Sequence, residues 1–285
     1  MIGVRTARRA ALALGFPKFA WKLRKLDFDI GHGELTLDVG SGSGPSPYAD
    51  VVVDYDPEGR ETNAGIAQSH GKALVWANAQ RLPFRDGVFG FVTCFHLLEH
   101  VADPAACLEE MQRVGRRGYI ETPNELFDYV IPYRDHRNRV SFDGRLLRLM
   151  RKSRWDVERF AARFGRGRSR QVFDLLIRNP ANLHVCYRWQ GRIEYSVSGE
   201  VIDDGCPASV EDADTERSIG ESSRVNALVC RIMRRQSIGD ERLLTLMRCI
   251  ECGGEKLMLA DGQARCEGCG RGYGRLNGYL DFRPR

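Results

Sequence analysis

The segment from Leu35 to Gly44 constrains the fold of this chain more than any other. Its apolar first half, Leu35 to Val39, predicts a buried strand, and glycines then alternate at Gly40, Gly42 and Gly44. Glycine reaches positive φ without a Cβ clash and lets a ligand approach the backbone closely. A strand that leads directly into such a turn favours a site for a nucleotide-like cofactor. An ordinary surface turn is the alternative for this stretch taken alone.

Apolar and β-branched runs recur along the first half of the chain and predict further strands. Together with the first, they form the set 35–39, 50–56, 74–78, 91–95 and 118–122. Asp103 followed by Pro104 is a helix start signal, and it predicts a helix that continues through Arg113. Residues 43–49 are too few for a crossover helix and include two prolines, so we expect a turn there.

Strands that alternate with helices predict an α/β fold with a Rossmann-like, doubly wound and mostly parallel sheet. The ligand of such a sheet lies at the carboxyl ends of its strands, where Asp54 can accept hydrogen bonds from both hydroxyls of a ribose. Residues 183–189 and 192–197 flank Gln190 and Gly191, which predicts a hairpin that adds an antiparallel edge to the sheet.

The chain has 285 residues and a net charge of +5, as expected of a globular protein. No apolar run approaches the roughly 20 residues of a membrane span, and the apolar part of the opening segment, residues 10–16, is short for a signal peptide. We therefore expect a cytoplasmic protein.

The opening segment is basic and amphipathic. Packing on the main domain is favoured for it, and peripheral contact with a membrane is the alternative. Residues 145–170 are rich in basic side chains, for which a solvated face is favoured over contact with nucleic acid.

Six motifs follow one another in order, namely LDVGSGSGP, VVVDYDP, LPFRDGVFGFV, FHLLEHVADP, LEEMQRV and GYIETPN. Over about residues 30–125 this succession resembles the class I S-adenosylmethionine-dependent methyltransferases of the type 11 group. The resemblance implies S-adenosylmethionine as the cofactor, with the glycine turn under its methionine part, Asp38 near its amino group and Asp54 at its ribose. The cofactor-binding residues that it implies are Asp38, Gly40, Ser41, Gly42, Gly44, Asp54, Tyr55, Asn78, Ala79 and Phe95.

Two positions depart from the pattern of that group. Asn78 stands where the group commonly has Asp, although its carbonyl oxygen can still accept a hydrogen bond from the exocyclic amine of adenine. Gly90 stands where Asp often follows the phenylalanine of the fourth-strand lead-in, so that structural contact is missing.

His96, Glu99 and His100 follow the fourth strand at the spacing i, i+3 and i+4, which in a helix places them on one face beside the expected methyl position. His96 or His100 is a candidate catalytic base, needed when the acceptor is a protonated hydroxyl, and a structural role in the loop is the alternative. In resembling quinone-pathway O-methyltransferases Glu-x-x-Glu-His binds a divalent metal, and His96 in place of the first Glu disfavours that role here. Further candidates for contact with the acceptor are Tyr133, Asp135, His136 and Arg137.

Four of the nine cysteines form two Cys-x-x-Cys pairs with a gap of thirteen residues between them. This doubled spacing presents four thiolates and predicts a closed, structural Zn²⁺ site rather than a redox pair. The predicted ligands are Cys249, Cys252, Cys266 and Cys269. The other five cysteines are scattered, as expected of reduced thiols.

The segment 243–282, with MRCIECGG and CEGCGRGYGRLNGYLDF, also resembles the small zinc-ribbon family that activates tRNA and rRNA methyltransferases. That resemblance implies a module that stabilises the methyltransferase domain of its own chain, with docking of the acceptor as the alternative. The predicted parts are an amphipathic helical region (1–29), the methyltransferase domain (30–200), an acidic linker (201–223), a connecting helix (224–241) and the zinc ribbon (242–285).

The sequence as a whole predicts an S-adenosylmethionine-dependent methyltransferase that acts on an oxygen or nitrogen of a small molecule or saccharide. No motif for base stacking or sequence reading appears, which disfavours nucleic acid as the acceptor. Methylation of RNA or protein is the first alternative, supported by the basic stretch and the activator-like ribbon. A scaffold that keeps the fold and has lost the cofactor is the second.

Overall fold

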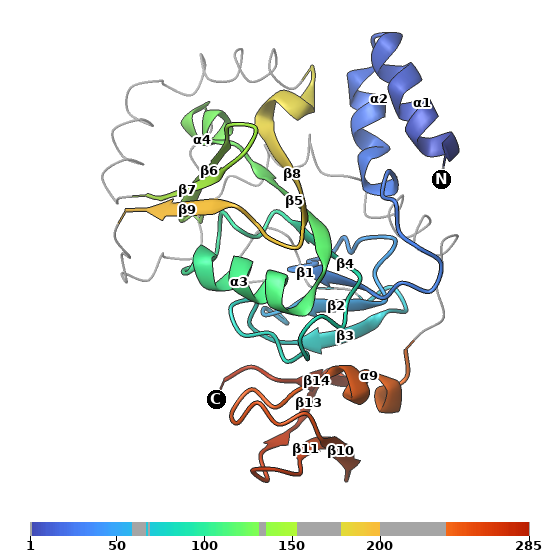
Figure 1. Cartoon of the computed structure of the whole chain (residues 1–285), viewed down its shortest axis with the longest axis vertical. Helices are drawn as coiled ribbons and strands as arrows, with labels where there is room; N and C mark the ends of the chain where they lie inside the picture. The colour runs from blue at the N-terminus through green and yellow to red at the C-terminus, as the bar shows by residue number, and fades with distance from the viewer. Residues whose placement is uncertain are drawn as a thin grey trace.

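A computed structural model describes residues 2–58, 67, 69–130, 135–152, 178–199 and 238–284. Its centre is a sheet that contains eight strands among these residues (Figure 1). In spatial order they are β13 (Arg275–Leu276), β14 (Tyr279–Asp281), β3 (Ala73–Trp76), β2 (Val51–Asp54), β1 (Thr36–Val39), β4 (Phe91–Phe95), β5 (Arg117–Pro123) and β8 (His184–Gln190). Neighbours from β14 to β5 run parallel, while β13 and β8 are antiparallel at the two edges.

The central strands form where the sequence is apolar on both faces, as a parallel sheet covered on both sides requires. All residues of β1, β3 and β4 are buried. The register places Leu37 opposite Val51 on one side and opposite Val92 on the other. The predicted mostly parallel α/β sheet is confirmed, with strand ends shifted by one or two residues.

One face of the sheet is covered by helix α3 (Pro104–Val114). The Asp103 side chain accepts hydrogen bonds from the amides of Ala105 and Ala106, and Pro104 occupies the first turn, so the predicted start signal is confirmed. Leu108 and Met111 are fully buried against the sheet in the main core. Helix α3 therefore fixes the strand ends from which the following loops emerge.

The opposite face is covered by irregular segments near the glycine turn. Residues 40–50 form turns and no helix, which confirms the expectation drawn from their length and prolines. Phe28 from the N-terminal segment and Tyr48 from this connection pack with Phe91, Phe95 and Tyr119 of the sheet. The ring centroids of Phe28 and Tyr119 are 5.0 Å apart. Aromatic side chains thus take the place of a crossover helix here.

The predicted hairpin after Gly191 is wrong in its second strand. β8 forms the antiparallel edge beside β5, but β9 (Tyr195–Ser198) pairs parallel with β7 (Leu147–Arg151), which in turn pairs with β6 (Asn138–Phe142). Gly191 has φ of +72° and turns the chain away from β8. Ile193 is then buried in the core, and the amide of Leu147 donates to the Glu194 carbonyl. The apolar face of β7 offers β9 a better-buried edge than β8 does.

The N-terminal helices α1 (Ile2–Ala13) and α2 (Pro17–Lys22) lead into a short 3₁₀ helix, η1 (Arg24–Leu26) (Figure 1). Trp21 of α2 packs on His184 with ring centroids 4.6 Å apart, so this region contacts the main domain as favoured. Leu14 and Phe16, between the two helices, are 72% and 61% exposed. Contact of this apolar turn with a membrane surface stays a prediction. No helix in the described ranges is long and apolar enough to cross a bilayer.

The C-terminal module is built from α9 (Asp240–Leu246) and a three-stranded antiparallel sheet of β10 (Leu257–Ala260), β11 (Gln263–Cys266) and β12 (Gly272–Tyr273). The hairpin β13–β14 then joins the main sheet, because β14 pairs parallel with β3. The Trp76 indole donates to the Leu276 carbonyl at 2.9 Å, and the amide of Phe282 donates to the Trp76 carbonyl at 2.8 Å. The module is therefore an extension of the main sheet.

Apolar side chains of the main domain and of the module also share one core. Phe84 is fully buried in the same cluster as Met247 and Tyr273, and the amide of Arg85 donates to the Leu246 carbonyl. The proposed domain bounds stay a prediction, and three of the segments concerned lie partly or wholly outside the described residues. These are the linker 201–223, the connecting helix up to residue 237, and residues 153–170 of the basic stretch.

Candidate functional site

The glycine turn after β1 is fastened to the end of β2. Gly40 has φ of +70°, and a Cβ there would lie 2.8 Å from the Leu97 side chain. The amides of Gly40 and Ser41 donate to the Val53 carbonyl, and the amide of Gly42 donates to Asp54 Oδ2 at 2.8 Å. In this structure these amides bond within the protein. The Ser41 hydroxyl of this turn is buried and has no hydrogen-bond partner within the described structure.

The two acidic residues at this edge have different surroundings. Asp38 is buried, accepts from Thr93 Oγ1 at 2.6 Å and from the Ser46 amide at 2.8 Å, and so closes the connection after the turn. Burial raises the pKa of Asp38 and also that of Asp54. Asp54 is partly exposed, and its oxygens retain acceptor capacity beyond the amides of Gly42 and Asp56. Asp54 is thus the carboxylate that can still reach a ribose.

The remaining residues assigned to the cofactor lie along the same edge. Asn78 follows β3, and its side-chain oxygen accepts from the amide of Gln80, in a turn that buries Ala79. Tyr55 follows β2 and is 42% exposed. Phe95 ends β4 and is buried among aromatic rings, with the Lys25 ammonium 4.8 Å above its ring. Gly44 closes the glycine turn by donating to the Ser41 carbonyl.

His96 stands at the end of β4 in a left-handed backbone conformation, with φ of +52°. Its ring lies 3.5 Å from the carboxylate of Glu99 and 3.5 Å from that of Glu121. Partial burial opposes the charged ring, but the two carboxylates outweigh it and raise the pKa of His96 to about 9. His96 is therefore positively charged at neutral pH in this structure, whereas a general base has to be neutral before it reacts.

Glu121 and Arg24 were missed by the reasoning from sequence. Glu121 is fully buried in β5 and binds Arg24 through two hydrogen bonds of 2.7 Å, while the Tyr119 hydroxyl donates to the same carboxylate. Burial raises the pKa of Glu121, but Arg24 and His96 outweigh that effect and hold it well below its usual range. An acidic residue inside an otherwise apolar strand was the available signal, because a buried charge needs a partner.

Glu99, His100 and His136 form a second group at this edge, which we name the histidine cluster. One potential ligand atom from each residue lies within 4.8 Å of the others. His136 was expected only as an acceptor contact, and the structure brings it next to His100, with ring centroids 4.9 Å apart. Burial raises the pKa of Glu99, but the His96 ring 3.5 Å away and the imidazoles of His100 and His136 lower it to about 2. Burial lowers the pKa of His100.

Of the other predicted acceptor contacts, Asp135 and Arg137 flank His136, and Tyr133 lies outside the described residues. The Asp135 carbonyl oxygen is 3.1 Å from His100 Nδ1. The amide of Arg137 donates to the Glu99 carbonyl at 2.6 Å. This segment therefore holds the loop after β4 in place.

Comparison with known proteins finds a family match in the region that carries the glycine turn. Residues 31–120 match the family described as "Methyltransferase domain". An uncharacterized methyltransferase of Mycobacterium sp. (strain JLS) is 37% identical over 91 residues, which are 30% of this chain and 36% of that protein. A demethylmenaquinone methyltransferase of Beutenbergia cavernae is 36% identical over 115 residues, which are 38% of this chain and 47% of that protein.

The chain thus spans between a third and a half of the length of these two relatives. Solved structures give weaker likenesses. The complex between the Haloferax volcanii Trm112 methyltransferase activator and a proposed methyltransferase aligns over 48% of this chain and 74% of that chain, with 15% identity and a TM-score of 0.29. The YcgJ protein of Bacillus subtilis aligns over 59% of this chain and 93% of that chain, with 16% identity and a TM-score of 0.33.

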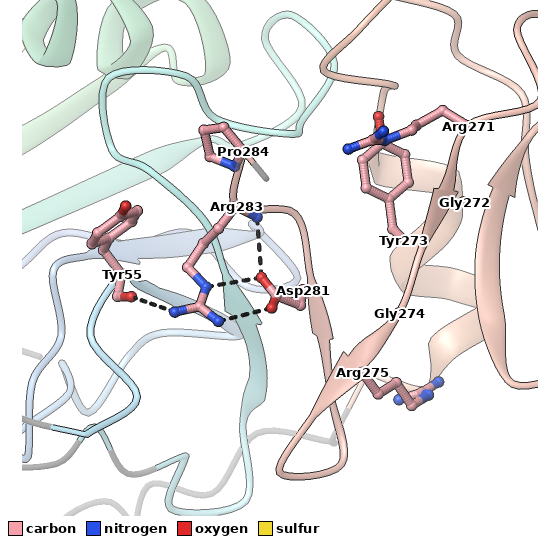
Figure 2. Close-up of a pocket in the computed structure, with 9 residues that line it drawn as sticks. All are labelled: Tyr55, Arg271, Gly272, Tyr273, Gly274, Arg275, Asp281, Arg283 and Pro284. Carbon is pink, nitrogen blue, oxygen red and sulfur yellow. Dashed lines mark hydrogen bonds and ion pairs between the residues drawn. The ribbon is translucent and has the colours of Figure 1, made fainter.

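A pocket of about 190 Å³ lies between the end of β2 and the C-terminal module (Figure 2). Tyr55 contributes from the domain, and Tyr273, Asp281 and Arg283 from the module. Arg283 is held by two hydrogen bonds to Asp281, of 2.8 and 2.9 Å, and donates to the Tyr55 carbonyl. Arg283 and Asp281 thus neutralise each other, while Arg271 and Arg275 make the remaining charged lining of the pocket basic.

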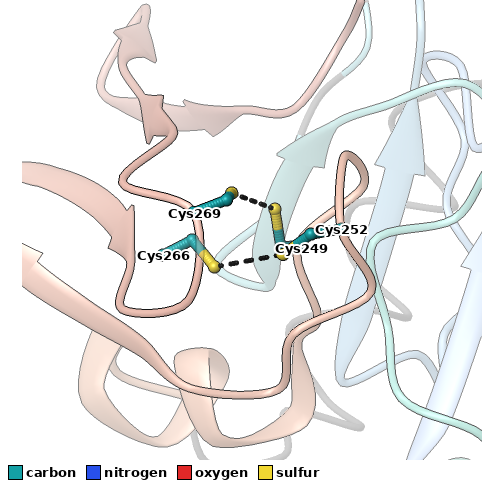
Figure 3. Close-up of side chains that lie close together, drawn as sticks. All are labelled: Cys249, Cys252, Cys266 and Cys269. Atoms are coloured by element: carbon teal, nitrogen blue, oxygen red, sulfur yellow. Dashed lines mark hydrogen bonds between the residues drawn. The ribbon is translucent and has the colours of Figure 1, made fainter.

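The four cysteines of the two Cys-x-x-Cys pairs come together in the module (Figure 3), and we name them the cysteine cluster. The sulfurs of Cys249 and Cys269 are 3.6 Å apart, as are those of Cys252 and Cys266. Four thiolates on one zinc ion at about 2.3 Å would be about 3.8 Å from one another, so this donor set fits the ion.

Two matching turns position these sulfurs. The amide of Gly253 donates to the Cys249 carbonyl and that of Gly270 to the Cys266 carbonyl, each at 2.9 Å. Both glycines have positive φ. The Tyr273 hydroxyl lies 3.0 Å from Cys249 Sγ. Burial raises the pKa of Cys249, but the Tyr273 hydroxyl and neighbouring amides outweigh it and lower the pKa to about 6. Cys249 therefore favours the thiolate form that metal binding requires. The Arg271 amide lowers the pKa of Cys269, but the hydrogen bonds with the other sulfurs outweigh it and raise the pKa to about 12.

Proposed function

We propose that this protein is an S-adenosylmethionine-dependent methyltransferase that transfers a methyl group to an oxygen or nitrogen of a small-molecule or saccharide acceptor. The observation that carries the proposal is the methyltransferase-domain match of residues 31–120, whose polar residues converge at the carboxyl ends of β1, β2, β3 and β4. Ligands of open parallel sheets bind at that edge.

S-adenosylmethionine would supply a methyl group on a sulfonium, ready for displacement by the acceptor atom. The side chains proposed to hold it are those of the fastened turn, with Ser41 beside its methionine part and Asp54 at its ribose. Ala79 and Asn78 would border its adenine. Holding two reactants in line lowers the barrier without a covalent step by the protein, so positioning is the main task of these residues.

The acceptor side of the site is proposed to include His96 and His100, which emerge from the end of β4 beside the glycine turn. A positively charged His96 suits contact with an anionic or oxygen-rich acceptor. One relative is a demethylmenaquinone methyltransferase, so a quinol hydroxyl belongs in the first panel of acceptors. A small molecule is preferred to a macromolecule because the sequence contains no motif for base stacking or sequence reading.

Calorimetry with S-adenosylhomocysteine tests the cofactor site directly. Wild-type protein should bind it, whereas Gly42→Val and Asp54→Ala should abolish binding, because Gly42 has φ of +51° and its amide donates to Asp54. Asp29→Ala, at an exposed position away from the turn, should bind like wild type. Absence of binding by the wild type at millimolar ligand would contradict the proposal and favour a non-catalytic scaffold.

We also propose that the cysteine cluster holds a structural zinc ion and that the module supports the methyltransferase domain. The matching turns around the four sulfurs and the core shared with Phe84 support this role. All four protein positions are thiolates, so none is left for a catalytic water. Elemental analysis of the purified chain should find zinc, and loss of zinc on chelation should lower the unfolding temperature. A zinc-free chain with unchanged stability would contradict the proposal.

A further inference from the structure

The histidine cluster has the composition of a metal site that the sequence motif alone disfavoured. Glu99 and His136 are buried, His100 is partly buried, and one potential ligand atom of each lies within 4.8 Å of the others. We propose that Glu99, His100 and His136 bind a divalent transition-metal ion. His96 is not part of this set, because its ring is shared between Glu99 and Glu121.

The hydrogen bond of the His100 imidazole leaves its second nitrogen for a metal. His100 Nδ1 lies 3.1 Å from the Asp135 carbonyl oxygen, which can only accept, so Nδ1 carries the proton and Nε2 carries a lone pair. His136 Nδ1 lies 2.8 Å from the Asp128 carboxylate, which orients its ring. Metal-binding histidines are typically held in this way, by a carbonyl or carboxylate on the second nitrogen.

Glu99 supplies the independent observation. Thr122 Oγ1 donates to Glu99 Oε2 at 2.7 Å, whereas Glu99 Oε1 is buried and has no hydrogen-bond partner in the described structure. The imidazole of His96, 3.5 Å away, is at ion-pair distance and beyond a good hydrogen bond. A buried carboxylate oxygen without a donor is costly, and a cation between Glu99 and the two imidazoles would satisfy it.

The two segments that carry the ligands are locked together before any ion binds. The side-chain amide of Asn138 donates to the carbonyls of Leu98 and Val101, both at 2.8 Å. The amide of Asn138 itself donates to the Glu99 carbonyl at 3.0 Å. Ligand atoms around one ion at about 2.1 Å are about 3.4 Å apart, which small side-chain rotations achieve from the observed separations.

The environment of Asp128 completes the arrangement. Asp128 is buried in α4 (Glu125–Val130), and Lys152 Nζ lies 2.6 Å from the same oxygen that faces His136. Lys152 therefore balances the charge of Asp128, and Glu99 would offset one of the two positive charges of the ion. Two imidazoles and one carboxylate suit zinc, iron, cobalt or manganese in the divalent state.

Three protein ligands leave at least one coordination position for an oxygen from outside. The cluster lies next to His96 at the end of β4, so a hydroxyl or carboxylate oxygen of the acceptor is the ligand expected there. This further role rests on the proposed methyltransferase function, whereas the binding of the metal does not.

Cobalt titration of the zinc-loaded full-length protein tests the site. Wild type should bind one equivalent of Co²⁺, with the weak visible absorption of nitrogen and oxygen ligands and without the strong thiolate-to-cobalt bands of the cysteine cluster. His100→Ala, His136→Ala and Glu99→Gln should each weaken binding by at least about 100-fold, and Asp128→Asn by about 10- to 100-fold. His32→Gln, at an exposed histidine elsewhere, should leave the affinity unchanged.

Three results would overturn the inference: no Co²⁺ binding by wild type at millimolar metal, thiolate bands in its spectrum, or unchanged affinity in both histidine variants. The number of bound Co²⁺ ions and the absorption spectrum are both measured on wild type. The test therefore stays decisive even if one of the variants fails to fold. Cobalt binding together with absent S-adenosylhomocysteine binding would contradict the proposed function and leave the metal site standing.

Discussion

The cysteine cluster and the histidine cluster offer metal ligands in opposite ways. The cysteine cluster comes from one short segment in which Cys249 and Cys269 are 20 positions apart, and two glycine turns shape it locally. The histidine cluster combines the loop after β4 with the segment before β6, and it exists because Asn138 fastens the two together. Local spacing specifies the first cluster, whereas only the tertiary fold specifies the second.

The two clusters therefore suit different roles: the cysteine cluster a structural one, and the histidine cluster the binding of a ligand. The cysteine cluster uses four protein ligands and adjoins a continuous core, so it suits a structural ion. The histidine cluster offers three ligands at the ligand-binding edge of the sheet, beside a charged and partly exposed His96. Variants that disturb one cluster should therefore change different properties from variants that disturb the other.

The largest effect is expected from Cys266→Ser, which removes a buried ligand of the cysteine cluster. Structural zinc contributes an apparent 10 to 16 kcal/mol in small zinc domains, about as much as the whole stability of a typical domain. The variant should lose zinc and lower the unfolding temperature of the methyltransferase domain too, because the core is shared. Elemental analysis and thermal unfolding check this result.

Cys186→Ser is the matched control for that change, since Cys186 is an exposed cysteine outside the cluster. It should retain zinc and unfold at the wild-type temperature. Equal unfolding temperatures for the two variants, with zinc lost only from Cys266→Ser, would show that the cluster binds metal without stabilising the fold. The contrast with the histidine cluster would then disappear.

The second effect concerns the buried ion pair of Arg24 and Glu121, which contacts the His96 ring beside the histidine cluster. Arg24→Met should lower the free energy of unfolding by about 3 to 5 kcal/mol, because it leaves Glu121 buried without its guanidinium. Arg5→Met removes an exposed partner of Asp27 and should cost less than about 1 kcal/mol. Urea unfolding measures both. Equal costs would show that His96 and Tyr119 are sufficient to stabilise the buried Glu121 carboxylate.

The third prediction concerns the pH dependence of the stability that the Arg24–Glu121 pair contributes. The pKa of Glu121 is well below the ordinary 4.5, since Arg24 and His96 outweigh its burial. Its contribution to stability is therefore complete above about pH 4.5 and is lost as the pH falls toward the folded-state pKa. The difference in unfolding free energy between wild type and Arg24→Met should shrink below that pH. A constant difference down to pH 3 would contradict this assignment.

The sequence was sufficient for features that depend on neighbouring residues. The strands around Leu37 and Val92, the helix start at Asp103 and the absence of a helix after Gly44 follow from local pattern and chain length. The partners of Glu121 and His136 could not be predicted in this way. Arg24 is 97 positions from Glu121, and one sequence contains no signal for which distant charges meet.

The error in the predicted hairpin has the same physical origin. The strand after Gly191 has the alternation of a hairpin partner, but it pairs with β7, which has buried side chains, instead of with β8. The amides of Gly40, Ser41 and Gly42 likewise bond to the end of β2, a partner that the local glycine pattern does not specify. In both places a tertiary neighbour decides between structures that the local pattern allows equally.

The smallest effect tests whether the cysteine cluster acts on the methyltransferase domain through the joined sheet. Trp76→Phe removes the donor to the Leu276 carbonyl, which should cost about 1 to 3 kcal/mol and speed hydrogen exchange in β14. Tyr279→Phe, which removes the bond to Ser69 at the partly exposed end of the same strand, should cost less. Faster exchange in β14 with unchanged zinc affinity would show that the cluster is stable by itself. Faster exchange with weaker zinc binding would show that the pairing of β14 with β3 makes the cluster part of the main fold, in which case even the locally specified cluster depends on a distant strand.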